Sequence, residues 1–214
     1  MSTKKKLLGV SGSPRKSATR RALQIALEEA ERVYGNRIEV EMISLHGKKI
    51  APCNHCNYCK KNDSLCVIDD AMTELYGKIS EADSFLFASP VYAMNVTPQL
   101  HAFFSRMRPL HKIKGGVLRN KLGAGIAVGG TRNGGQEQTI NSIINACLTR
   151  GIIYVGGEPG NYSGAMVCSR DNGPAGVEED EVGMESLKNM GARIAEVTLM
   201  FDPAAVKGRE AAAL

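Results

Sequence analysis

Short apolar runs alternate with amphipathic segments along the chain. Four runs end in Gly or Pro and are typical of buried strands, at residues 5–12, 84–90, 122–130 and 151–157, and a fifth strand is expected at residues 37–45, where Ile38, Val40 and Met42 alternate with polar residues. Segments with helical spacing of apolar residues follow them, at residues 19–35, 69–83, 97–107, 135–151 and within 177–201. Strands that alternate with helices predict an α/β fold with a doubly wound, five-stranded parallel sheet.

Two details of the helices can be checked against a structure. The apolar face of the first helix is expected to include Leu23, Ala26, Leu27, Ala30 and Val33. The second helix carries Met72, Leu75, Tyr76 and Ile79 at helical spacing, and Asp69 is expected to cap its N-terminus.

The size and composition of the chain suit one compact domain over residues 1–214. The chain has 214 residues and a hydrophobic fraction of 43%, which is enough for a core without disulfides. No apolar run approaches the roughly 20 residues of a bilayer span, and the N-terminus lacks a cleavable apolar region. We therefore expect a cytoplasmic protein that contacts no membrane. The net charge of +5 and the absence of Trp do not suggest nucleic-acid binding.

The loop after the first strand, "SGSPRKSAT", suits a phosphate group. Its hydroxyls lie just before a helix, whose free N–H groups and positive dipole end attract anions. The loop matches neither the nucleoside-triphosphate motif nor the dinucleotide motif, so a mononucleotide phosphate fits better. Simple capping of the helix by Ser and Thr is the alternative. The candidate residues are Ser11, Ser13, Pro14, Arg15, Ser17 and Thr19.

The loops after the third and fourth strands, "SPVYAMN" and "GGTRNGGQE", could hold a flat ring. Tyr92 offers an aromatic face, Asn95 a hydrogen-bonding edge, and the glycines permit close approach of the backbone. Ordinary turn formation is the alternative for each loop taken separately. The candidate residues are Ser89, Pro90, Val91, Tyr92, Asn95, Gly129, Gly130, Thr131, Asn133, Gly134 and Gly135.

A loop after the second strand, at residues 51–68, contains four cysteines with the spacing C-x2-C-x2-C-x6-C. Clustered cysteines in a reducing compartment more often hold a metal or perform redox chemistry than form disulfides. Dense triplets of this kind are typical of iron-sulfur clusters, while a closed zinc site and four free thiols are the alternatives. The predicted ligands are Cys53, Cys56, Cys59 and Cys66. His55 is an alternative ligand, but it is expected to lie just outside the ligand set or to face solvent, and Cys147 and Cys168 are expected to be structural.

These motifs give the chain a resemblance to a known family. The three loops, the segment "SPVYAMNVTPQLHAFFSR" and the cysteine run resemble the iron-sulfur flavoproteins within the flavodoxin-like NADPH-dependent FMN reductases. The resemblance implies a flavodoxin-like fold, FMN, a 4Fe-4S cluster and a homo-oligomer, either a dimer or a tetramer. It also implies that a ferredoxin-like donor reduces the cluster, which passes electrons to FMN and then to a small acceptor such as oxygen, peroxide or a quinone.

Such electron transfer requires no catalytic acid, base or nucleophile. Three other functions remain open. One is an NAD(P)H-dependent FMN or quinone reductase whose cysteine site holds zinc or is empty, and another is a non-catalytic flavodoxin-like electron carrier. The third is an interaction module stabilised by zinc. The Gly- and Ser-rich stretch at residues 156–176 is expected to be a lid, an interface arm or a disordered loop.

Overall fold

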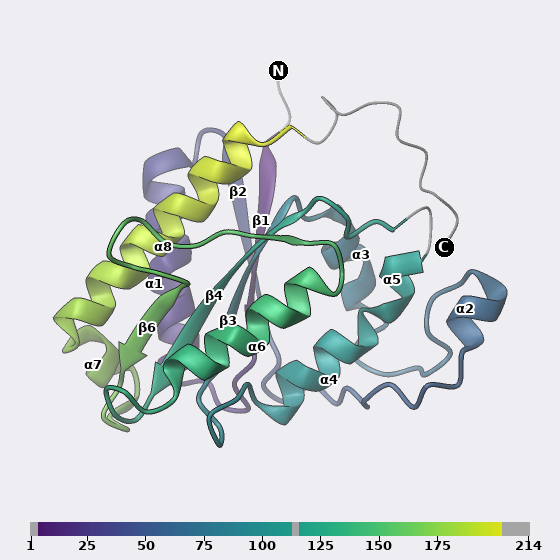
Figure 1. The fold of residues 1–214 in the computed structure, drawn as a ribbon, viewed down its shortest axis with the longest axis horizontal. Helices are drawn as coiled ribbons and strands as arrows, with labels where there is room; N and C mark the ends of the chain where they lie inside the picture. The colour runs from purple at the N-terminus through teal and green to yellow at the C-terminus, as the bar shows by residue number, and fades with distance from the viewer. Residues whose placement is uncertain (1–3, 113–115, 203–214) are drawn as a thin grey trace.

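The computed structural model describes residues 4–112 and 116–202, in which a parallel sheet lies between two layers of helices (Figure 1). The strand order is β2-β1-β3-β4-β5, and each pairing is parallel, which confirms the predicted doubly wound architecture. The predicted domain, 1–214, also includes residues that lie outside the described ranges. The strands are β1 (Lys5–Ser11), β2 (Ile38–Ser44), β3 (Ser84–Pro90), β4 (Leu122–Gly129), β5 (Ile153–Tyr154) and β6 (Ala165–Cys168).

The fifth position of the sheet is shared by two short strands. β5 pairs with the start of β4 at Leu122, and β6 pairs with its end, from Ile126 to Gly129. The prediction that 156–176 is a loop throughout is therefore wrong for β6. Its short apolar sequence, Ala165–Cys168, packs three buried side chains onto the sheet, but its glycine-rich flanks hide that signal in the sequence.

Helices cover both faces of the sheet because alternate strand residues point to opposite sides. Phe85 and Phe87 of β3 lie in one apolar cluster, while Leu86 and Ala88 lie in the other. The second cluster includes residues of α1 and α8, and the first includes residues of α3, α4 and α6. The helices are α1 (Ala18–Tyr34), α2 (Tyr58–Asn62), α3 (Leu75–Glu81), α4 (Pro98–Arg106), α5 (Arg108–Lys112), α6 (Gln136–Leu148), α7 (Gly173–Glu178) and α8 (Glu181–Met200).

Two local predictions are wrong. Val33 is 40% exposed, since it lies in the last turn of α1, away from the core. Asp69 does not cap α3, which begins at Leu75 after Glu74. The neighbouring Asp70 instead accepts the backbone N–H of Met72 at 2.9 Å, so the chain makes an irregular turn before the helix starts. Among the described helices, none combines the length and apolarity that crossing a bilayer requires.

We expect Gly191→Ala to destabilise the fold, although Ala is the better helix former. A Cβ at Gly191 of α8 would lie 1.9 Å from the carbonyl oxygen of Ala26 in α1, so the two helices would have to separate. Overpacking of this kind costs about 3 kcal/mol, which lowers the melting temperature of a chain of this size by roughly 6–12 °C. Thermal unfolding monitored by circular dichroism measures this change.

Gly77→Ala is the matched control for this substitution. Gly77 lies within α3, and a Cβ there would meet nothing within 4 Å. We expect this variant to gain about 0.5–1 kcal/mol from the helix propensity of Ala. An equal gain in Gly191→Ala would show that close packing of α1 against α8 does not limit stability.

Candidate functional site

Loops from four strands meet at the carboxyl edge of the sheet, at the bottom of Figure 1. The loop after β1 is tied to β3 and α4, because Gly12 donates to the carbonyl of Ala88 and accepts from the Thr97 hydroxyl at 2.6 Å. The loops after β3 and β4 also meet, since a Cβ at Gly135 would lie 3.1 Å from the Cα of Met94. In a doubly wound sheet, this edge is where ligands bind.

The predicted phosphate loop has polar groups that the described protein leaves without partners. The Ser11 hydroxyl is fully buried, and no group in the described part of the chain bonds to it. Ser17 is the N-cap of α1, yet its side chain makes no capping hydrogen bond. The first N–H groups of a helix also lack partners within the helix. These donors and hydroxyls fit an anion such as a phosphate.

The other predicted residues of this loop have different surroundings. Ser13 is buried, and its hydroxyl accepts the N–H of Arg15 at 3.1 Å. Thr19 is buried, whereas the Arg15 residue is exposed. The carbonyl of Pro14 bonds to the His46 ring at 2.7 Å, which fixes the loop against the segment after β2. The loop is thus held by hydrogen bonds within itself and to the segment after β2.

The loop after β3 forms a tight and strained hairpin. Tyr92 and Asn95 exchange two backbone hydrogen bonds of 2.9 Å, and both residues between them have left-handed backbones. Non-glycine residues in this conformation cost free energy and occur often at ligand sites. Tyr92 is 40% exposed and remains available to a ring. The Asn95 side-chain oxygen accepts the N–H of Val96, so its amide N–H₂ remains as the donor of that side chain.

Two predicted residues hold this hairpin in place. The Ser89 hydroxyl accepts the N–H of Thr97 and donates to the carbonyl of Pro90. The N–H of Val91 donates to Val128 of β4 at 2.9 Å. Of the predicted ring residues in this loop, Tyr92 and Asn95 therefore present side chains, while the others shape the backbone.

The glycine-rich loop after β4 depends on Gln136, which the sequence analysis did not single out. The Gln136 amide donates to the carbonyl of Thr131 at 2.6 Å and accepts the N–H of Gly134 at 2.7 Å. A Cβ at Gly129 would lie 2.4 Å from this amide, so glycine is needed there. Asn133 has a left-handed backbone. Both Asn133 and Thr131 are exposed. The loop therefore offers backbone groups at the edge of the site.

The segment after β6 also reaches the site, which the sequence reading missed. A Cβ at Gly173 would lie 3.3 Å from the Ser17 hydroxyl, and one at Gly130 would lie 2.7 Å from the Asp171 carboxylate. Asp180 anchors this segment by accepting the N–H of Cys168 at 2.7 Å and by pairing with Arg132. Burial opposes ionisation of Asp180, but these hydrogen bonds outweigh it and hold its pKa below the usual value.

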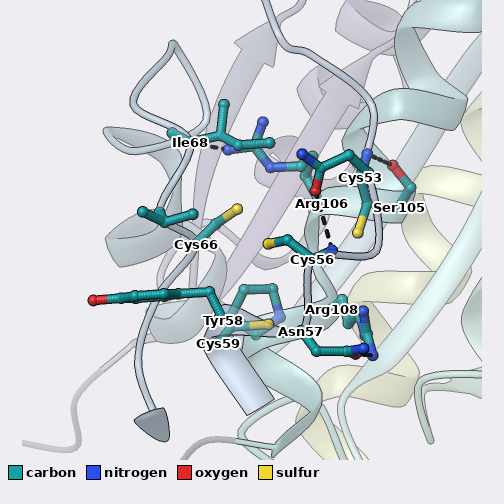
Figure 2. Close-up of a pocket in the computed structure, with 13 residues that line it drawn as sticks. Cys53, Cys56, Asn57, Tyr58, Cys59, Cys66, Ile68, Ser105, Arg106 and Arg108 are labelled. Atoms are coloured by element: carbon teal, nitrogen blue, oxygen red, sulfur yellow. Dashed lines mark hydrogen bonds between the residues drawn. The ribbon is translucent and has the colours of Figure 1, made fainter. Parts of the chain in front are cut away.

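The four clustered cysteines line one pocket beside the end of α4 (Figure 2). All six cysteines of the chain are free thiols, with Cys147 and Cys168 buried and the four loop cysteines partly or fully exposed. His55 is exposed, as expected. Within the described ranges, no three Cys, His, Asp or Glu side chains are arranged around a single metal ion.

The C-terminal end of α4 and the start of α5 hold the cysteine loop. The Ser105 hydroxyl accepts the N–H of Cys53 at 3.1 Å, and Arg108 donates to the side chain of Asn57 at 2.6 Å. Arg106 and Arg108 both line the pocket and place positive charge beside four potential thiolates. A pocket with four thiols and nearby cations fits an anionic iron-sulfur cluster. Cys53, Cys56, Cys59 and Cys66 are the residues that would hold it.

Helix α4 connects the two groups of candidate residues. It starts after Thr97, whose hydroxyl bonds to the phosphate loop, and it ends at Arg106 in the wall of the cysteine pocket. A helix of 9 residues is about 14 Å long at 1.5 Å per residue. Figure 1 shows α4 running from the lower edge of the sheet toward α2 and the cysteine loop.

Solved structures place this protein in the flavodoxin-like fold class. The chain is similar to a WrbA-like flavodoxin from Agrobacterium tumefaciens, with a TM-score of 0.63 and 15% identity, over 94% of this chain and 100% of the other. It is also similar to an NAD(P)H:quinone oxidoreductase from Methanothermobacter marburgensis, with a TM-score of 0.63 and 13% identity, over 89% and 96% of the two chains. These likenesses confirm the predicted fold class.

Sequence comparison assigns the family. The model of the NADPH-dependent FMN reductases matches residues 5–159. An iron-sulfur flavoprotein of Archaeoglobus fulgidus is 41% identical, over 89% of this chain and 96% of its own. One from Methanocaldococcus jannaschii is 40% identical, over 92% and 98%. The chain belongs to the iron-sulfur flavoproteins of the NADPH-dependent FMN reductase family and is a flavin-dependent oxidoreductase.

Proposed function

We propose that the protein binds FMN at the carboxyl edge of the sheet and a 4Fe-4S cluster at its four loop cysteines. In this proposal, electrons pass from a ferredoxin-like donor through the cluster to FMN and on to oxygen, peroxide or a quinone. The observation that carries the proposal is the position of α4, which begins at the phosphate loop and ends in the cysteine pocket. A cluster exchanges single electrons and a flavin one or two, so together they couple the two kinds of reaction.

The residues around each group have distinct tasks in this proposal. Ser11, Ser13, Ser17 and the N–H groups at the start of α1 bind the phosphate, because they are the unpaired or fixed polar groups of that loop. Tyr92 faces the ring, and the glycine-rich loop allows the backbone to approach it. The cysteine thiolates hold iron, and Arg108 and Arg106 offset their charge. Electron transfer of this kind requires no general acid or base.

Assembly could bring the two sites closer together than they are within one chain. Tyr58, Leu65 and Val67 of the cysteine loop are exposed, as are Tyr92 and Met94 of the hairpin. Exposed apolar side chains of this kind suit a subunit contact. We therefore propose a homo-oligomer, either a dimer or a tetramer, in which both sites lie near a contact.

The composition of the purified protein tests this proposal. Anaerobic protein should contain about four iron and four sulfide per chain if the four local ligands hold a cubane. Heat should release FMN, identified by its mass, because the loop offers one phosphate site and no second site for an adenylate. Iron, sulfide and zinc assays give the metal content, and the anaerobic absorption spectrum gives the cluster type.

Other compositions would contradict specific parts of the proposal. Zinc at the cysteines would favour the NAD(P)H-dependent FMN or quinone reductase, which the family description also suggests. Rapid bleaching of the flavin by NADPH without another protein would support that alternative. FAD, or no flavin after expression with ample riboflavin, would overturn the assignment of the phosphate loop. A protein with FMN and cluster that reduces no small acceptor would be an electron carrier.

A further inference from the structure

A fully buried arginine closes the cysteine loop at both of its ends. The side chain of Arg106 has 0% exposure and donates to the carbonyl of Ala51 at 3.0 Å and to that of Ile68 at 2.9 Å. Its third bond goes to the carboxylate of Asp70 at 2.7 Å. Ala51 and Ile68 stand at the two ends of the segment that carries all four clustered cysteines. One guanidinium group thus fixes where the loop leaves the body of the protein and where it returns.

Asp70 completes this closure. Its carboxylate also accepts the N–H groups of Ala51 and Met72, each at 2.9 Å. Burial alone would raise the pKa of Asp70, but the bonds from Arg106 and from these two amides hold it below its usual value. The buried cation therefore has an ionised partner, which such a group requires.

The Nε of Arg106 makes no hydrogen bond within the described part of the chain. Its Nε–H is buried, and no acceptor for it exists among the described residues. An unsatisfied buried donor is costly, and one on a charged group more so. Arg106 lines the same pocket as Cys66, and Figure 2 shows the side chains of Arg106 and Cys66 close together in its wall. A sulfur held in this pocket is the acceptor that the arrangement lacks.

We propose that Arg106 is the positioning residue of the cysteine site. It closes the loop at both ends, and its free Nε–H donates to a sulfur at Cys66 when the thiolates hold a cluster. The inference rests on the proposed function, since it assigns Arg106 a role toward the cluster. Hydrogen bonds to cluster sulfurs stabilise the reduced, more negative state and so raise the reduction potential.

Arg106→Lys tests both parts of this role. Lys keeps the charge, but it has no Nε–H and no planar fork to reach Ala51 and Ile68 together. We expect the variant to retain less iron per chain than the wild type. Its remaining cluster should have a reduction potential lower by about 59 mV, which is a tenfold change for a one-electron couple. Iron assays and a redox titration followed by electron paramagnetic resonance measure the two changes.

Arg150→Lys is the matched control. Arg150 is partly buried, donates to backbone carbonyls of Ala146 and Phe104, and has a buried Nε without a partner in the described chain. It does not line the cysteine pocket. We expect this variant to keep the iron content and potential of the wild type. Wild-type iron content and potential in Arg106→Lys would overturn the inference, as would equal losses in both variants.

If Arg106→Lys does not fold, Asp70→Asn provides a second test, in which the reduction potential should change in the opposite direction. The amide keeps an acceptor for Arg106 but leaves the guanidinium uncompensated beside the pocket. The potential should therefore rise, and an unchanged potential would overturn the inference. A wild-type protein without iron and sulfide would defeat the proposed function as well. A wild-type protein with a cluster that neither substitution affects would defeat this inference alone.

Discussion

Replacing Cys56 with Ala should slow the reduction of FMN by ferredoxin on the order of 100-fold, while FMN stays bound. Loss of a ligand should exceed the roughly 10–100-fold cost of outer-shell substitutions at metal sites. The phosphate and ring loops lie at the other end of α4, so they should keep the flavin. Stopped-flow absorbance with reduced ferredoxin measures the rate. Direct chemical reduction of the flavin should change far less.

Cys147→Ala is the control for this prediction. It also removes a thiol, but Cys147 lies on the buried face of α6 and does not line the cysteine pocket. Each variant must first be shown to hold full FMN and the wild-type oligomeric state, because loss of a cluster removes folding energy and could disturb a subunit contact. Equal ferredoxin-driven rates in Cys56→Ala and the wild type would refute the relay. Slow rates in Cys147→Ala would mean that general destabilisation explains the effect.

Periodicity predicted the sheet because its central strands, β1, β3 and β4, are buried on both faces and therefore read as apolar runs, whereas β2 shows alternating burial. Residues Phe85 to Ala88 form such a run, and their side chains lie alternately in the two apolar clusters on either face of the sheet. β6 escaped the same reasoning, since a strand of four residues has too few apolar positions to stand out. β6 forms because it pairs with β4, and this pairing joins residues that are distant in sequence.

The candidate site likewise has residues that could be predicted from local sequence and residues that could not. The cysteine set was readable because its members are close together in the chain, as are the hydroxyls of the first loop. Arg106, Gln136 and Asp171 were not assigned to the sites, because each acts through contacts with residues distant in sequence or through loop geometry. A buried arginine inside an amphipathic helix gives no local sign of what it will bind.

Replacing both Ser13 and Ser17 with Ala should weaken FMN binding by at least about 100-fold. Each hydrogen bond to a charged group contributes about 1.5–3 kcal/mol, and both hydroxyls can donate to a phosphate. Ser13 uses its oxygen to accept the N–H of Arg15, which leaves its proton free to donate. Ser17 makes no capping bond at all. Titration of flavin-free protein with FMN, followed by flavin fluorescence, measures the affinity, and Ser142→Ala on α6 is the control.

The single variant Ser17→Ala separates ligand binding from helix capping. A capping serine that is replaced with Ala costs about 1 kcal/mol of stability. Because the Ser17 side chain makes no cap bond, the flavin-free variant should unfold at the wild-type temperature, while its affinity for FMN falls. A loss of stability with unchanged affinity would instead make Ser17 a cap. The iron and sulfide content should not change in either case, since the cysteine loop is held by Ser105, Arg106 and Arg108 at the far end of α4.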